Sequence, residues 1–442
     1  FGFNPTKRTL KDLEIFANKV LPTTIPLSFT LNKNQQRKLS NDINNGTLGN
    51  PIPEKIALNI VENMHIFTDK TANSQLFMSI HNNIFGNPIP DNVALKIAEN
   101  LPTFTDPDAQ YTIAVAINEG IFGTSIPNNI ALKIAENMHI FKGPEAQQNI
   151  ALAINKGVFG NPIPDNVALK ITEQLSTFTA PYAQSSIAQA INKGVFENPI
   201  PNNVALKIAE NLSTFTAPYA QRFIALAINK GVFENPIPDN VALNIAENLS
   251  TFTAPHAQSN IAQAINNGVF ESPIPSDIAL EITKNMRVFT NPNAQRLIAR
   301  AIFHKVFRAP IPDNIALKIA ENIPIFTDPN AQQLITMAMK NNIFGETVND
   351  AVALNMAKNM HVFTDPKAQQ YFASAIINGL FQKRVVMNLL KIPIPNNIAL
   401  KIAENLSTFQ SPETLVKIAS GNLSTKYLYN SVFFVFSIIS LF

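Results

Sequence analysis

A sequence repeat of 37 residues recurs along this chain, and this period restricts the fold more than any other feature of the sequence. The tripeptide Pro-Ile-Pro (Ser-Ile-Pro in one copy) marks it, and its last proline falls at Pro53, Pro90, Pro127, Pro164, Pro201, Pro238, Pro275 and Pro312. A ninth copy keeps the register with Val348-Asn349, and a tenth begins at 393. A period of this length indicates stacked supersecondary units, each unable to bury its apolar face alone.

Each copy predicts two helices, as the one at 88–123 illustrates. Asp91 or Asn92 can cap the first helix, and Asn100, which tolerates the left-handed conformation, can end it. The apolar positions between them cover an arc of about 200°, which predicts a helix packed between neighbours on two sides. The second helix begins at Asp106-Pro107 and ends before Gly120. Its expected buried stripe is Ala109, Ile113, Ala116 and Ile117.

Other positions repeat without change and have structural explanations. Two columns of phenylalanine close the ends of each repeat and hold 19 of the 31 Phe, so we interpret them as core. Lys96 and Glu99, three residues apart on the first helix, recur as a pair that we expect to be structural rather than catalytic. A column of glutamine near the start of the second helix predicts a hydrogen-bonded ladder between adjacent repeats. It comprises Gln110, Gln147, Gln184, Gln221, Gln258, Gln295, Gln332 and Gln369.

These patterns predict an all-α fold, an α-solenoid of about ten 37-residue helix-turn-helix repeats. The expected organisation is an N-terminal partial repeat or cap (1–49), nine tandem repeats (50–382), an insertion (383–391), a divergent last repeat (392–421) and a hydrophobic tail (422–442). By layout the chain resembles HEAT-like and tetratricopeptide-like proteins. Its lack of Trp removes the tetratricopeptide signature, and its period exceeds the 34 residues of that family, so no residue role carries over.

No motif points to catalysis, a cofactor or a metal. The chain has no Cys, which excludes disulfides and thiolate sites. Three of its six histidines, His65, His139 and His361, share one repeat position, and no pair has metal-ligand spacing. Neither a phosphate-binding glycine loop nor a nucleophile elbow is present. The sequence therefore predicts a protein that is not an enzyme.

The positions that differ between repeats gather on one face of the second helix, opposite its buried stripe. They are equivalent to Asp108, Tyr111, Thr112, Val115 and Glu119, and we call this the variable face. Drift at a solvated surface is the simplest explanation, but Tyr, Arg, Phe and His are typical of protein interfaces. The residues that we predict to contact a partner are Tyr182, Tyr219, Arg222, Phe223, Leu226, His256, Arg296, Arg300 and His304.

Positive charge concentrates in one stretch of this face. Between Pro273 and Arg308 there are six Lys or Arg against two Asp or Glu, a net +4 in a chain whose total is +3. Arg296, Arg300 and His304 are spaced four residues apart, so all three should project from the variable face.

These features favour a scaffold that binds a protein partner. A modular nucleic-acid-binding repeat protein is the first alternative, although no regular line of Lys or Arg for phosphates is evident. A structural or surface-attachment array is the second. The membrane becomes a partner only if the apolar stretch 432–442 is a truncated transmembrane segment, since 11 residues are too few to span a bilayer. Location in the cytoplasm and export to a host cell both remain open, as does whether the chain, which starts at Phe1, is a fragment.

Overall fold

The computed structural model describes residues 31–345, 347–378, 380–381, 394–405 and 408–409. Within these ranges the chain forms helices and no strand, which confirms the predicted all-α repeat fold. The chain divides into two compact bodies, Phe1–Ala220 and Gln221–Phe442, and each is described by itself. The insertion at 383–391 and the tail at 422–442 lie outside the described residues.

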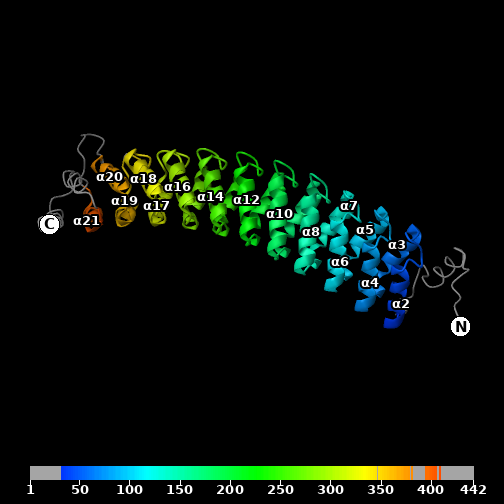
Figure 1. Ribbon diagram of the computed structural model, residues 1–442. Helices are drawn as coiled ribbons and strands as arrows, with labels where there is room; N and C mark the ends of the chain where they lie inside the picture. The colour runs from blue at the N-terminus through cyan, green and yellow to red at the C-terminus, as the bar shows by residue number, and fades with distance from the viewer. Residues whose placement is uncertain (1–30, 346, 379, 382–393, 406–407, 410–442) are drawn as a thin grey trace, which may run out of the picture. The chain divides into compact units, whose positions relative to one another are not determined.

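The N-terminal body consists of two layers of helices, one from each half of the repeat (Figure 1). The first helices are α3 (Glu54–Glu62), α5 (Asp91–Glu99), α7 (Asn128–Glu136), α9 (Asp165–Glu173) and α11 (Asn202–Glu210). The second helices are α2 (Lys33–Asn44), α4 (Lys70–His81), α6 (Pro107–Asn118), α8 (Pro144–Lys156) and α10 (Pro181–Lys193). First helices pack on first helices and second on second, and α2 takes the place of a second helix because it packs on α4. Helix α12 (Pro218–Asn229) contains the boundary between the bodies.

The C-terminal body repeats this arrangement. Its first helices are α13 (Asp239–Glu247), α15 (Ser276–Lys284), α17 (Asp313–Glu321), α19 (Asp350–Lys358) and α21 (Asn396–Asn405). Its other second helices are α14 (Pro255–Asn266), α16 (Pro292–Phe303), α18 (Pro329–Lys340) and α20 (Pro366–Ile377). In both bodies a short 3₁₀ turn follows the first helix, namely η1 (Met64–Ile66), η2 (Leu101–Thr103), η3 (Met138–Ile140), η4 (Leu175–Thr177), η5 (Leu212–Thr214), η6 (Leu249–Thr251), η7 (Met286–Val288), η8 (Ile323–Ile325) and η9 (Met360–Val362).

The start of the first helix differs from the prediction. In α5 the flanking residue is Pro90, which has no side-chain cap and whose carbonyl accepts the N–H groups of Val93 and Ala94. Inside the first turn, the side-chain oxygen of Asn92 also accepts the N–H of Val93, at 2.8 Å. Asp91 and Asn92 lie inside the first turn, so the prediction that one of them is the cap was wrong. The fixed φ of proline, −54° here, suits a helix start and makes a side-chain cap unnecessary for the geometry. The second helix begins as predicted, with the Asp106 carboxylate accepting the N–H of Ala109.

The asparagine at the end of the first helix also has another role than predicted. Asn100 keeps a right-handed φ of −89°, so it is not a left-handed stop. Its side-chain amide donates to the carbonyl of Lys96 at 3.0 Å and to that of Val61, in the preceding repeat, at 3.1 Å. The same bond to the preceding repeat recurs at Asn137, Asn285, Asn322, Asn359 and Asn405. This column therefore joins successive first helices.

The glutamine ladder is confirmed. In the C-terminal body, Gln258 is 3% exposed. Its side-chain oxygen accepts the N–H of Asn291, in the next repeat, at 2.9 Å. Its amide nitrogen donates to the carbonyl of Thr253 at 3.1 Å. Since the buried side chain bonds backbone of its own repeat at one group and backbone of the next repeat at the other, each glutamine fixes the start of its own second helix to the start of the next.

The Pro-Ile-Pro element joins the two ends of its own repeat through its backbone. The N–H of Ile89 donates to the carbonyl of Ile121, in the loop after the second helix of the same repeat, at 2.9 Å. Equivalent bonds are made by Ile52, Ile126, Ile163, Ile237, Ile274, Ile311 and Val348. These residues are buried, so the middle position of the tripeptide is both core and a link between the loops that begin and end a repeat.

Both phenylalanine columns are core, as predicted. Every one of these side chains is 4% exposed or less. The predicted stripe of the second helix is likewise buried, and the structure widens it with Gln110 and Ala114. The faces left to solvent are consequently narrow. From α6 to α20, the exposed positions of the second helix are the proline that begins it and positions of the variable face.

Candidate functional site

The acidic and basic side chains of the first helices form structural pairs. Lys96 and Glu99 are 2.7 Å apart, and the hydrogen bond to the carboxylate, followed by its charge, raises the pKa of Lys96. The same pairing recurs in six further repeats across the two bodies. Within the described ranges, no three His, Cys, Asp or Glu side chains cluster closely enough to hold a metal ion. No described helix has the length and apolarity needed to cross a membrane.

The variable face is not uniform in exposure. The positions equivalent to Asp108 and Glu119 are exposed in every described second helix from α6 to α20. The positions equivalent to Thr112 are half-buried in each of these helices, and those equivalent to Val115 are half-buried in all but one. The helical wheel assigned all of them to one solvated surface, whereas packing of neighbouring second helices places two columns in the grooves between them.

The candidate contact residues divide accordingly. In the N-terminal body, Tyr182 and Tyr219 are 74% and 66% exposed. In the C-terminal body, Phe223 and Leu226 are half-buried. The exposed candidates of that body are Arg222, His256, Arg296, Arg300 and His304.

Replacing Tyr182 with serine is expected to change the free energy of unfolding by less than about 0.5 kcal/mol, because the ring has little contact to lose. Urea unfolding followed by circular dichroism measures this. Phe178→Ser, at a position only 2% exposed, is the comparison and should be strongly destabilising. A comparable loss from both variants would place Tyr182 in the core.

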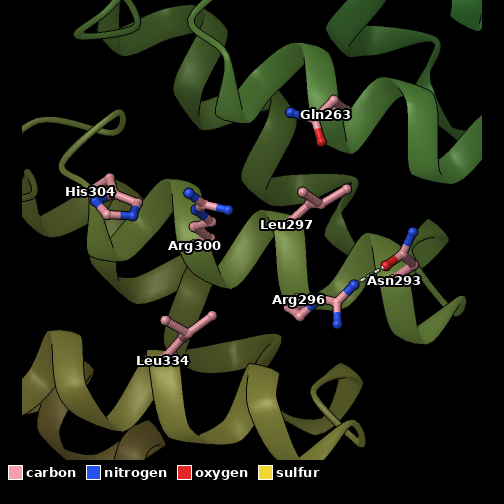
Figure 2. A pocket seen from close by; sticks show the side chains of 7 residues that line it. All are labelled: Gln263, Asn293, Arg296, Leu297, Arg300, His304 and Leu334. Carbon is pink, nitrogen blue, oxygen red and sulfur yellow. Dashed lines mark hydrogen bonds between the residues drawn. The ribbon is translucent and has the colours of Figure 1, made fainter.

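The structure brings three of the predicted residues together at a depression of about 560 Å³ in the C-terminal body. Arg296 and Arg300 lie on α16, and His304 follows the end of this helix. Figure 2 shows Leu297 beside them and Leu334 approaching from α18. The lining residues are Gln263, Asn293, Arg296, Leu297, Arg300, His304 and Leu334. Tyr182 and Tyr219, in the other body, are not part of it.

The arginines of the depression lack acidic partners. Arg296 donates to the side-chain oxygen of Asn293, a neutral group (Figure 2). Among the described residues, no carboxylate forms an ion pair with Arg296 or Arg300. By contrast, Lys284 on the first-helix side pairs with Glu281, and Arg287 there donates to Asn322 at 3.0 Å. Among the described residues, Arg287 thus resembles Arg296 in bonding only a neutral amide, but Arg296 and Arg300 lie together on the second-helix side, whereas Lys284 on the first-helix side is paired.

A separation of charge extends over the C-terminal body. From Gln221 onward, the second helices α12, α14, α16, α18 and α20 carry no Asp or Glu. They carry Arg222, Arg296, Arg300, Lys340 and Lys367. The first helices of the same body, α13 to α21, carry eight Asp or Glu against four Lys. Asp328 and Asp365, which precede α18 and α20, cap the N-termini of these helices and accept backbone N–H groups there.

This separation is hidden when charge is followed along the chain, because first and second helices alternate in the sequence. It is evident when the charge of the second helices alone is summed. No protein-family model matches the chain, and no curated protein is detectably similar to it in sequence.

Proposed function

We propose that this protein is a binding scaffold that recognises an acidic partner protein through the second helices of its C-terminal body. The observation that carries the proposal is the charge separation in that body, with free arginines on a side that has no acidic residue in its helices. Such a surface attracts an acidic partner over a distance and repels a basic one.

Two further features support a protein as the partner. The second helices of this body present exposed arginines together with the half-buried Phe223 and Tyr371, and arginine and tyrosine are among the residues that dominate the energetics of protein interfaces. The layout of the repeats also resembles that of HEAT-like and tetratricopeptide-like proteins. In such proteins, equivalent positions of successive helices build extended binding surfaces. Nucleic acid fits less well, because phosphate contacts call for a regular line of cations, whereas α14 carries none.

Selection from a random peptide library tests the proposal. Peptides retained by the wild-type protein and not by Arg296→Gln/Arg300→Gln are expected to be enriched in Asp and Glu, since both guanidinium groups donate charge-assisted hydrogen bonds to carboxylates. Lys156→Gln/Lys193→Gln, which removes two exposed charges from second helices of the N-terminal body, is the matched control and should leave the selection unchanged.

The same proteins are then titrated with random single-stranded RNA and with double-stranded DNA over a series of salt concentrations. Weak binding of both is expected. Micromolar or tighter binding with a steep salt dependence, lost in the arginine variant, would overturn the proposal in favour of nucleic acid.

A further inference from the structure

We infer that the depression on α16 and α18 binds an extended acidic peptide whose apolar side chains recur at every third residue. This inference rests on the proposed function and deepens it, because it specifies the conformation and sequence pattern of the partner segment. It follows from the apolar residues that lie among the cations of these helices. Attraction between opposite charges gives no reason for these positions to be apolar.

An apolar row runs across the second helices of the C-terminal body. Leu297 on α16, Leu334 on α18 and Tyr371 on α20 occupy the same repeat position, and all three are half-buried. Leu297 and Leu334 line the depression (Figure 2). Asn260 ends the row on α14. In the N-terminal body the equivalent positions are polar, namely Thr112, Asn149 and Ser186, so the row belongs to the C-terminal body.

Cations flank this row on each helix. Arg296 and Arg300 stand one residue before and three residues after Leu297. On α18, the Lys340 ammonium lies 5.2 Å from the ring centre of Tyr371, so it covers part of the far end of the row. A ligand that fills this surface must present apolar groups to the row and carboxylates to its edges.

The spacing of the row limits the conformation of that ligand. Neighbouring helices pack about 8–10 Å apart, so successive apolar side chains of the ligand must be separated by about the same distance. Polyproline II conformation advances about 3.1 Å per residue with three residues per turn, which places every third side chain on one face at about 9.3 Å. A β-strand instead alternates faces and repeats at about 6.6 Å.

The acidic character of the ligand also favours an extended form. Carboxylates one turn apart destabilise an α-helix, and chains of like charge extend in solution. An acidic segment thus needs little rearrangement to follow the row, which lowers the entropic cost of binding.

Two synthetic peptides of identical composition test the inference. One, Glu-Leu-Glu-Glu-Leu-Glu-Glu-Leu-Glu, has leucine at every third position, and the other, Glu-Leu-Glu-Leu-Glu-Leu-Glu-Glu-Glu, has it at every second. Fluorescence anisotropy gives the dissociation constant of each. The first is expected to bind at least about tenfold more tightly, the discrimination that small changes in apolar contact typically produce.

Protein variants identify the contact. Leu297→Ser/Leu334→Ser should remove this preference while leaving weak binding of both peptides, and Leu297→Met/Leu334→Met should retain it. Asn260→Ser, in the same column of α14, is the control and should have no effect. Circular dichroism and thermal melting establish that each variant is folded.

The outcomes separate the two proposals. Equal affinities for the peptides, both reduced by Arg296→Gln/Arg300→Gln, would overturn the spacing rule and leave the acidic-partner proposal standing. Failure of both peptides to bind, together with tight salt-dependent binding of RNA, would overturn both.

Discussion

Replacing Phe270 with alanine is expected to lower the free energy of unfolding by about 3–5 kcal/mol. The side chain is 1% exposed and belongs to the second phenylalanine column. Its loss leaves a cavity beside Val269, whose carbonyl accepts the N–H of Ile237 from the Pro-Ile-Pro element that begins the same repeat. Urea denaturation followed by circular dichroism measures the effect.

Phe303 provides the matched control for this variant. It lies at the end of α16 outside both columns and is half-buried, with its ring against that of His304 at a centroid distance of 5.2 Å. Phe303→Ala should cost about 1 kcal/mol. Equal losses from the two variants would contradict the assignment of the columns as core.

The phenylalanine and glutamine columns could be predicted because period alone identifies them. A side chain that recurs every 37 residues, in phase with a helical stripe, meets the same surroundings in every repeat. Apolar columns then indicate core, and a polar column within a buried stripe requires partners that only a neighbouring repeat can supply. Both inferences depend on periodicity and on hydrogen-bonding capacity, which are properties of the sequence.

The role of Asn100, by contrast, could not be predicted from period and residue type. Its place at the end of a helix suggested a left-handed stop, a local conformation. The structure instead uses its side chain to reach Val61, and that bond depends on the distance between two repeats. The Ile89 N–H bond to Ile121 could not be predicted either, because it depends on the distance between two loops of one repeat and involves no side chain.

The candidate site was predictable only in part. Periodicity on a helical wheel placed Arg296, Arg300 and His304 on one exposed face, and the structure has them exposed around one depression. The wheel could not distinguish the exposed column of Tyr182 from the half-buried column of Leu297, because that difference is set by packing against adjacent helices. The apolar row of Leu297, Leu334 and Tyr371 was therefore not predicted.

Replacing Gln258 with leucine is expected to lower the free energy of unfolding by about 2–5 kcal/mol. Leucine has a similar size but can neither accept from the Asn291 N–H nor donate to the Thr253 carbonyl. Each backbone group left buried without a partner costs about 1–3 kcal/mol. Because stability in a repeat array is approximately a sum over repeats and their interfaces, the loss should concentrate where α14 packs on α16.

Hydrogen exchange at the Asn291 amide tests the mechanism directly. In the wild-type protein this amide donates to the Gln258 oxygen at 2.9 Å and should exchange slowly. It should exchange much faster in Gln258→Leu, while an amide such as that of Ile89 in the N-terminal body keeps its protection. Gln370→Leu, on the exposed side of α20, is the control for the change of residue type. If Gln258→Leu were as stable as this control and the Asn291 amide stayed protected, the glutamine column would act through packing of its methylene groups. Hydrogen bonding between repeats would then rest on the asparagine column.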